Sequence, residues 1–176
     1  MKNEKKEQSN QNVPPVLPRR FAPLLRRAWY GLNQTFRRRI AYSGITPDQY
    51  TMLRLLSEGP PEGMTQRELC TRMSSDPNTI ASLLNRMQAA GVIERSTHER
   101  DRRAHRVCIL AKGRSVYAEL LVLANELQGS VMHALPEKRR EQFLKDLEII
   151  ADACQASIRA TAESGGKGVV KPPETR

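Results

Sequence analysis

The sequence contains few cysteines and histidines, the residues that form disulfide bonds and most zinc sites. Its 176 residues contain three cysteines and three histidines, and these are widely spaced. They are Cys70, Cys108, Cys154, His98, His105 and His133. The odd number of cysteines argues against a disulfide framework or a zinc ribbon, and it fits a reducing cytoplasm. We therefore expect a cytoplasmic protein that holds no metal and no cofactor.

Long apolar runs and catalytic constellations are also missing. No segment approaches the roughly 20 apolar residues of a membrane span, and residues 1–10 lack the apolar region of a signal peptide. The sequence has no glycine-rich phosphate loop, no Ser-His-Asp context and no pair of acids in a plausible cleft. We expect neither a membrane protein nor an enzyme.

Acidic residues are fewer than basic ones. The sequence contains 19 Asp and Glu and 29 Lys and Arg, which gives a net charge of +10. An excess of this kind indicates a polyanionic partner, nucleic acid first and an anionic membrane surface second. Residues 94–106 contribute a small part of it. Most of the excess comes from residues 19–42, which contain no acid and seven arginines: Arg19, Arg20, Arg26, Arg27, Arg37, Arg38 and Arg39.

The chain length suits one domain between two tails. Residues 1–18 are polar and then proline-rich, and residues 163–176 are rich in glycine and proline. We predict that both tails are disordered. Residues 19–162 are predicted to form a single domain.

Helical periodicity dominates this domain. Between about residues 22 and 42, apolar side chains follow one face of a predicted helix and most arginines follow the opposite face. The apolar face consists of Phe21, Leu25, Ala28, Trp29, Leu32, Phe36 and Ile40. Further helices are predicted over 46–57, 112–133 and 136–162.

The middle of the domain predicts two short helices joined by a tight turn. Thr65 and Glu68 have the spacing of a capping box, which begins the first helix. Asp76 can cap the second helix, and Gly91 stands just beyond its predicted end.

A hairpin is predicted next, with strands over 92–95 and 104–110 joined by a charged loop over 96–103. Helix, turn, helix and basic hairpin make a winged helix-turn-helix. The predicted fold class is therefore mainly α, a winged helix-turn-helix with a two-stranded β-hairpin wing and additional N- and C-terminal helices. In such a fold the second short helix enters the major groove of DNA with its N-terminal residues leading.

Six sequence blocks at characteristic spacings support this fold. They are Glu68-Leu69-Cys70, Asp76-Pro77-Asn78-Thr79-Ile80, Arg86-Met87, Gly91-Val92-Ile93-Glu94-Arg95, Asp101-Arg102-Arg103 and Leu110-Ala111-Lys112-Gly113. With these blocks, residues 46–114 resemble the MarR family of bacterial transcription regulators. The resemblance implies a homodimer that binds double-stranded DNA at a pseudo-palindromic operator, by default as a repressor. It also implies that residues 46–113 form the DNA-binding region, and that 19–45 and 114–162 form the dimerisation helices.

We expect DNA contacts on the second short helix and on the hairpin. The residues are Pro77, Asn78, Thr79, Ser82, Arg86, Arg95, Arg100, Asp101, Arg102, Arg103 and Arg106. Arg103 matches the wing arginine that reaches into the minor groove, and Asp101 matches the acid that orients the wing. Arg86, Arg95, Arg102 and Arg106 are expected to contact phosphates. The chain departs from the family pattern at Ser82, at Ala111 and in the Ser74-Ser75 turn.

Relatives hold effectors in a pocket between the dimerisation and DNA-binding regions, and small aromatic acids are common effectors in the family. The corresponding residues here are Trp29, Tyr30, Asn33, Phe36 and Tyr50. These rings suit an aromatic or anionic small molecule. They suit the core of a dimer equally, and the sequence does not decide between the two.

Two alternatives stay open. The arginines of residues 19–42 suit a solvated face, a surface that steers or contacts DNA phosphates, or a site for an anionic ligand or membrane. The chain as a whole also suits a protein-interaction module, in which the winged helix and the basic first helix bind an acidic partner protein.

Overall fold

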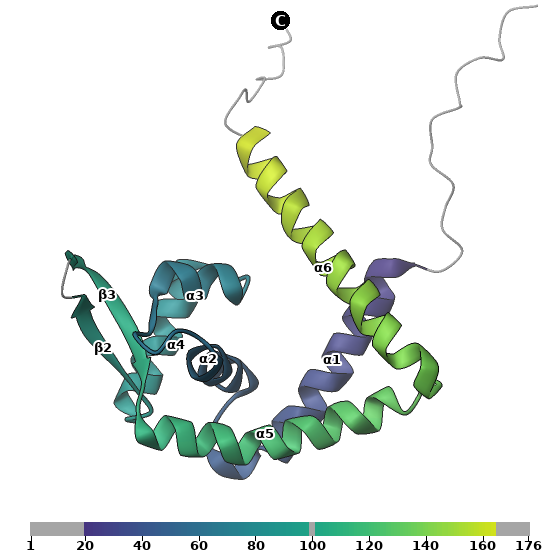
Figure 1. Cartoon of the computed structure of the whole chain (residues 1–176), viewed down its shortest axis with the longest axis horizontal. Coiled ribbons are helices and arrows are strands. Elements are labelled where there is room, and N and C mark those ends of the chain that lie inside the picture. The colour runs from purple at the N-terminus through teal and green to yellow at the C-terminus, as the bar shows by residue number, and fades with distance from the viewer. Residues whose placement is uncertain (1–19, 99–100, 165–176) are drawn as a thin grey trace, which may run out of the picture. The chain divides into compact units, whose positions relative to one another are not determined.

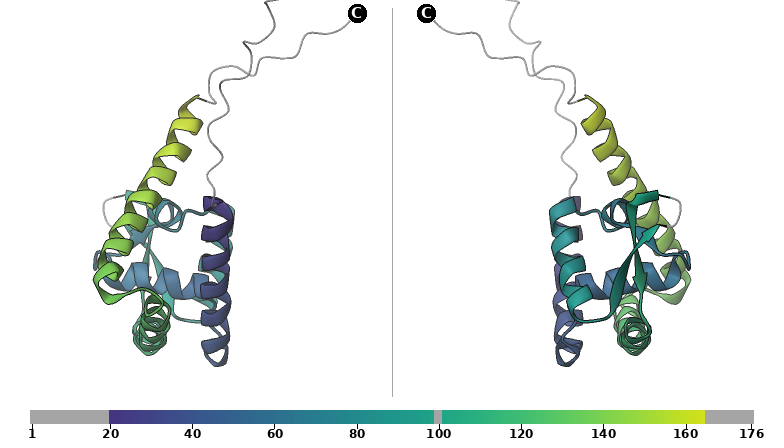
Figure 2. Two further views of the ribbon diagram at one scale, coloured as in Figure 1. Left: turned by 90° about the vertical axis from the view of Figure 1, so that its right-hand side faces the viewer. Right: turned by 90° about the vertical axis from the view of Figure 1, so that its left-hand side faces the viewer.

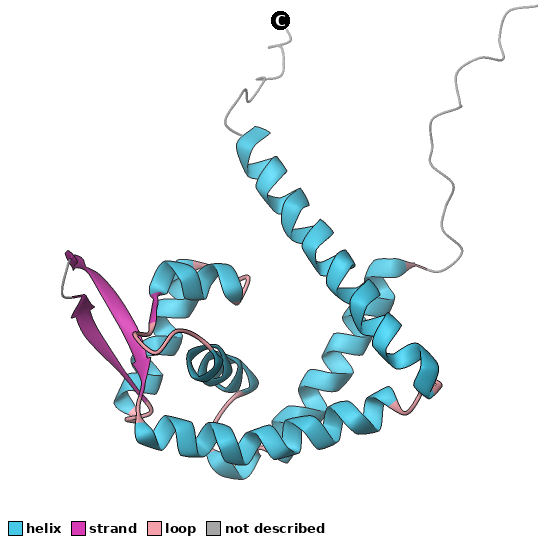
Figure 3. Cartoon of the chain, viewed as in Figure 1, coloured by secondary structure: helices cyan, strands magenta, loops and turns pink. Residues whose placement is uncertain are grey.

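The structure, a computed structural model, describes residues 20–98 and 101–164. Helices dominate these residues, and their strands form one small sheet (Figure 1 and Figure 3). The predicted mainly helical, winged fold class is thereby confirmed. The chain divides into two compact units, Met1–Asn125 and Glu126–Arg176, which are taken one at a time. The predicted tails lie outside the described residues, apart from 163 and 164.

Helix α1 (Phe21–Arg39) carries Pro23 in its first turn, where a proline is tolerated. The prediction that this helix runs to Tyr42 is wrong. The α-helix stops at Arg39, and a 3-10 turn, η1 (Ala41–Ser43), follows it. Gly44 then adopts a φ of +69°, a left-handed conformation that glycine reaches at little cost, and the chain turns away from the helix axis there.

Helix α2 (Pro47–Glu58) begins at a complete capping box. The Thr46 hydroxyl oxygen accepts a bond from the Gln49 N–H at 3.3 Å, and the Gln49 amide oxygen accepts one from the Thr46 N–H at 2.9 Å. Proline at the first helical position has no N–H to leave unpaired. The inner face of α2 buries Tyr50, Met52, Leu53 and Leu56.

The helix-turn-helix consists of α3 (Gln66–Arg72) and α4 (Pro77–Ala89), which pack against each other (Figure 1). The predicted capping box at the start of α3 is confirmed, because Thr65 and Glu68 exchange both of its hydrogen bonds. The predicted position of Gly91 just beyond the end of α4 is also confirmed, since Gly91 follows the C-cap with a φ of +68°.

The sheet contains three antiparallel strands in the order β1-β3-β2. Strands β2 (Ile93–His98) and β3 (Asp101–Ile109) form the hairpin, and Figure 2 shows them crossing as a twisted pair. The hairpin loop was predicted too long, because backbone pairing continues to His98 and Asp101. Most of the predicted loop, residues 96–103, is therefore strand.

Strand β1 (Met64–Thr65) was not predicted. It pairs Met64 with Val107 and Thr65 with Arg106, on the far edge of β3 from β2. Two residues are too few to show the alternation that marks a strand in a sequence.

The core of the first unit lies where α2, α3 and α4 meet the sheet. The side chains that are almost fully buried include Ile40, Met52, Leu53, Met64, Leu69, Ile80, Leu84, Met87, Val92, Ile93, Val107 and Leu120. The inner face of α4 is therefore committed to packing, and its other face is left for solvent or a ligand.

Helix α5 (Ala111–Met132) begins directly after β3 and packs tightly at its start. A Cβ added at Gly113 would stand 2.2 Å from the Val92 carbonyl oxygen, so only glycine fits there. Beside it, the Lys112 ammonium donates a hydrogen bond of 2.8 Å to the Ala90 carbonyl oxygen at the C-terminus of α4. The first turn of α5 is thus joined to the last turn of α4.

In the second unit, helix α6 (Glu137–Ser164) follows the end of α5 after a short turn. The predicted break over 133–136 is confirmed. Arg140 Nε donates to the carbonyl oxygens of Met132 at 3.0 Å and Leu135 at 3.1 Å. These bonds satisfy carbonyls that the end of a helix leaves without intrahelical partners.

Candidate nucleic-acid interface

The N-terminus of α4 is held by the carboxylate of Asp76. One carboxylate oxygen accepts the N–H groups of Asn78 at 3.0 Å and Thr79 at 2.9 Å, and the other accepts the Thr79 hydroxyl. The Thr79 hydroxyl, and then the Thr79 and Asn78 N–H groups, hold the pKa of Asp76 below its usual value. From α3, the Gln66 amide donates to the Pro77 carbonyl oxygen at 3.1 Å. The first turn of α4 is therefore fixed in place before any ligand binds.

One face of α4 is exposed and polar. The predicted groove-facing residues lie on it: Pro77, Asn78, Thr79, Ser82 and Arg86 are all exposed. Asn85 is exposed on the same face, and the sequence did not single it out. The opposite face buries Ile80, Leu83, Leu84 and Met87. The helix thus presents short polar groups on a face that the core does not use.

Arg95, a predicted phosphate contact on β2, is engaged inside the protein. Its Nη2 donates to the Asn85 amide oxygen at 2.8 Å and lies 3.5 Å from the Ala81 carbonyl oxygen. Its Nε is buried without a hydrogen-bond partner among the described residues. The side chain is half-buried, so it braces the hairpin against α4.

Arg106, another predicted phosphate contact, is also half-buried. Its Nη1 donates to the Gly63 carbonyl oxygen at 2.7 Å, which ties β3 to the segment before β1. Hydrogen bonds from the N–H and hydroxyl of Thr65 lower the pKa of Glu68, and the nearby positive charge of Arg106 lowers it further. Both half-buried arginines thus connect segments within the winged helix.

The tip of the wing holds the remaining predicted contacts. Arg100 lies outside the described residues, as do the side chains of Asp101, Arg102 and Arg103. The first three residues of β3 are Asp101, Arg102 and Arg103, and Asp101 lies opposite His98 of β2. These three arginines therefore remain sequence-based predictions at the far end of the hairpin.

The predicted effector residues separate into two groups. Phe36 and Tyr50 are buried in edge-to-face contact, with ring centroids 4.9 Å apart, and Tyr117 of α5 lies 5.8 Å from Tyr50. Trp29 and Tyr30 are 60% and 59% exposed and do not join this cluster, and Asn33 is half-buried. No sequence signal pointed to Tyr117, because it lies 67 residues after Tyr50 and only the fold brings the rings together.

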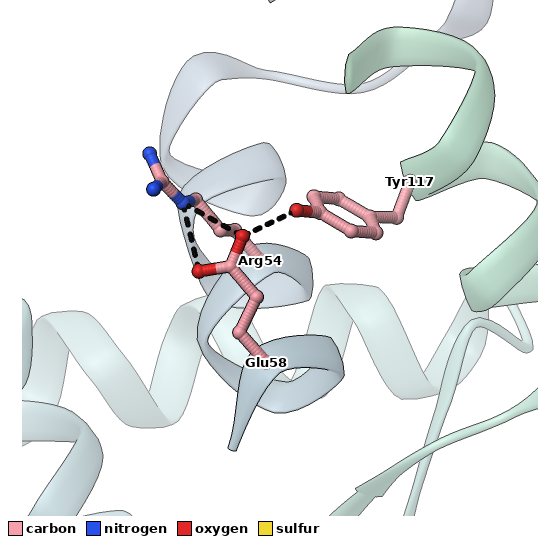
Figure 4. Close-up of polar contacts among 3 residues, drawn as sticks. All are labelled: Arg54, Glu58 and Tyr117. Atoms are coloured by element: carbon pink, nitrogen blue, oxygen red, sulfur yellow. Dashed lines mark hydrogen bonds and ion pairs between the residues drawn. The ribbon is translucent and has the colours of Figure 1, made fainter.

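A polar group borders the aromatic cluster (Figure 4). The Tyr117 hydroxyl donates to Glu58 Oε1 at 2.6 Å, and Arg54 Nε donates to both carboxylate oxygens of Glu58 at 3.1 Å. These bonds lower the pKa of Glu58, while burial and the Glu58 carboxylate raise the pKa of Tyr117 to about 12. The group connects α2 with α5.

Helix α1 exposes both apolar and basic side chains. Only Phe36 within it is buried, whereas large apolar side chains are exposed at Phe21, Leu24, Leu25, Trp29, Tyr30 and Leu32. Its arginines are exposed too, and none of those described forms an ion pair with another described residue. In the second unit α6 exposes Phe143, Leu144, Ile149 and Ile158.

Within residues 20–98 and 101–164, no helix is long and apolar enough to cross a membrane. In the same residues, no cluster of three or more His, Cys, Asp and Glu side chains is arranged to hold a metal ion. The three cysteines are free thiols.

Residues 43–104 match the profile of the MarR family, which spans the helix-turn-helix and the first part of the wing. The chain is also 25% identical over 154 residues to the HTH-type transcriptional regulator TtmR of Methylorubrum extorquens. That similarity covers 88% of this chain and 77% of TtmR.

Solved structures share the fold. The DNA complex of MepR from S. aureus matches with a TM-score of 0.71 and 19% identity, over 76% of this chain and 98% of MepR. BpsR of Bordetella bronchiseptica, whose DNA binding is regulated by 6-hydroxynicotinic acid, matches with a TM-score of 0.71 and 22% identity, over 80% of this chain and 99% of BpsR. Residues 43–104, with the winged helix and the capped, outward-facing α4, therefore belong to the MarR family, and the whole chain is similar to HTH-type transcription regulators.

Proposed function

We propose that this chain is a cytoplasmic repressor that binds a pseudo-palindromic operator as a homodimer. Each subunit places α4 in a major groove and its wing in the adjoining minor groove. A two-fold dimer reads two half-sites about one helical turn, or ~34 Å, apart. Asn78, Thr79, Ser82 and Arg103 provide most of the discrimination between sequences, and exposed arginines such as Arg86 provide phosphate contacts.

The exposed polar face of α4 is the observation that carries this proposal. Three hydrogen bonds to Asp76 fix its first turn, and the core fixes its inner face, so the polar groups are held in place for a groove. The similar fold of MepR, which was solved with DNA, supports the same use of the helix.

The exposed apolar faces support the homodimer. Helix α1 leaves six large apolar side chains open to solvent in the single chain, and α6 leaves four. Apolar area of this kind is stabilised when a second copy covers it, at roughly 25 cal/mol for each Å² removed from water. Residues 19–45 and 114–162 are accordingly proposed as the dimerisation segments.

We further propose that a small aromatic or anionic effector modulates DNA binding. The buried Phe36–Tyr50 pair, with Tyr117 and Arg54 beside it, offers ring faces and a cation within the first unit. The regulation of BpsR by 6-hydroxynicotinic acid supports an effector of this class. Such a ligand can act only if its affinity differs between the DNA-binding and non-binding arrangements of the dimer.

Sequence-specific binding is tested by selecting duplexes from a library with 20 randomised base pairs. The selected duplex and a scrambled duplex of equal composition are then titrated at several salt concentrations. We expect a preference of about 10³-fold or more for the selected duplex, and a steep fall in affinity with salt. Equal binding to both duplexes, or no retardation of either, contradicts the proposal and favours the protein-interaction module.

The effector is tested with salicylate and 6-hydroxynicotinic acid, each titrated into the complex with the selected duplex. Trp29 is the only tryptophan and reports on binding through its emission. We expect release of DNA together with a change in that emission. Unchanged DNA affinity with both acids contradicts an aromatic-acid effector and leaves the DNA-binding proposal standing.

A further inference from the structure

Asn85 occupies an unusual place on the exposed face of α4. It follows Asn78 by seven residues, almost two full turns, so it continues the same stripe about 10 Å further along the helix axis. Its side chain is exposed, yet its amide oxygen is held by Arg95 at 2.8 Å. A residue on this face is thus oriented by the hairpin.

The contact fixes which end of the amide points outwards. An arginine side chain has five N–H donors and no acceptor. The Asn85 atom that faces Arg95 must therefore be the oxygen, because the reversed amide would place donor against donor. Arg95 itself has little freedom, since it is half-buried and its Nη2 also lies 3.5 Å from the Ala81 carbonyl oxygen.

We propose that Asn85 contacts a base by donating hydrogen bonds to it. Arg95 is the positioning residue, because it holds the amide oxygen and leaves the N–H groups of Asn85 to face the DNA. The proposal rests on the proposed DNA binding through α4. Arg95 then serves base discrimination from inside the protein, in place of the phosphate contact expected from its sequence position.

Donor polarity selects a particular base edge. In the major groove, an unconstrained asparagine pairs with adenine by accepting from N6 and donating to N7. The oxygen of Asn85 is turned towards Arg95, whereas its two N–H groups donate to no other described residue. Guanine presents two acceptors, N7 and O6, and no donor in that position. Asn85 therefore favours guanine over adenine at one position of each half-site.

The test uses the full chain and the duplex selected by the wild type, with each base pair of one half-site replaced in turn. Asn85→Ala is expected to weaken binding about 5- to 100-fold and to abolish the preference for guanine at one position. Asn85→Asp keeps an acceptor for Arg95 but presents an acceptor to DNA, so the preference is expected to move to cytosine, whose N4 donates. Thr51→Ala is the control, because Thr51 is an exposed polar residue of α2 that lies neither on the outward face of α4 nor in the proposed dimerisation segments.

Arg95 is tested by two variants of similar length. Arg95→Met removes every N–H donor of the side chain and allows the Asn85 amide to rotate. Adenine should then be accepted as well as guanine at the same position. Arg95→Lys retains a positively charged donor group and should keep the guanine preference. A purely structural role for Arg95 would weaken binding to all duplexes equally and leave the base preferences unchanged. Circular dichroism checks that each variant is folded.

The outcomes distinguish a failure of this inference from a failure of the proposed sequence-specific DNA binding. If wild type selects a sequence and Asn85→Ala keeps every base preference, Asn85 reads no base, and the proposed function still stands. If Asn85→Asp shows no change of preferred base, its donor polarity is not what the site uses, and the inference is likewise wrong. If the wild-type chain selects no sequence, both the inference and the proposed sequence-specific function are overturned.

Discussion

Replacing Gly113 with alanine probes the tight packing where α5 leaves the hairpin. The added Cβ would stand 2.2 Å from the Val92 carbonyl oxygen and 2.9 Å from Ile109 Cγ1. The carbonyl group has little room to retreat, because it accepts a hydrogen bond of 3.0 Å from the Leu110 N–H. The backbone at the end of α4 or the first turn of α5 must therefore move.

Two opposing terms set the magnitude. In an open helix, replacing glycine with alanine stabilises a protein by about 0.4–1 kcal/mol, because alanine has fewer unfolded conformations. Overpacking against a rigid neighbour costs about 1–3 kcal/mol. We expect the strain to dominate at Gly113 and to lower the free energy of unfolding by about 1–2 kcal/mol. Gly129→Ala, in the same helix with no heavy atom within 4 Å of the new Cβ, should instead raise it by up to about 1 kcal/mol.

Urea unfolding followed by circular dichroism measures both changes. All variants are compared at one protein concentration, because stability that depends on dimerisation varies with concentration. The midpoint should fall for Gly113→Ala and rise for Gly129→Ala, with similar slopes. If the two variants were equally stable, α5 would not approach Val92 as described, and the reasoning would be refuted.

Further predictions concern the polar contacts and the DNA interface. Tyr117→Phe should lower the free energy of unfolding by about 1 kcal/mol, a modest value because the partner carboxylate is half-exposed. Since the pKa of Tyr117 is raised from 10.0 to about 12 in the folded chain, this hydroxyl stabilises the fold below pH 10 and loses that effect as the pH rises towards 12. Denaturant unfolding at pH 7 and pH 11 should therefore show a smaller alkaline loss in Tyr117→Phe than in wild type. Asp76→Ala should lower the melting temperature at pH 7, and the difference should shrink as the pH falls through the depressed pKa of Asp76. Thermal melts at pH 7 and pH 3 measure this, and an unchanged difference would contradict the cap. In salt titrations of the selected duplex, Arg86→Ala should reduce the slope of log affinity against log salt by about 1. Arg103→Ala should weaken specific binding by about 1–3 kcal/mol, and wild-type affinity in that variant would contradict the wing assignment.

The helices of the winged helix were predictable because their signals act over a few residues. Thr65 meets Glu68 within one turn, and Gly91 ends α4 by its own conformation. Periodicity likewise predicted which face of α4 is buried. The same local reasoning failed at Tyr42, where a 3-10 turn replaces the end of a helix.

The candidate site was predictable only in part. The sequence placed Asn78, Thr79 and Ser82 on an outward face of a groove-entering helix, and the structure exposes all three. It did not show that Phe36 and Tyr50 meet Tyr117, because that cluster depends on how α2 and α5 pack.

The sequence by itself indicated the resemblance to the MarR family, the order of the helices and the position of the hairpin, because caps, turns and periodicity are properties of neighbouring residues. Only the tertiary structure showed which acceptors Arg95 and Arg106 reach. Arg95 and Arg106 are charged residues in a basic hairpin, and their sequence context indicates phosphate contacts. In the single chain their guanidinium groups donate to Asn85 and to Gly63. The direction of a long side chain depends on which acceptors the fold brings within its reach, and those acceptors lie 10 and 43 residues away along the chain.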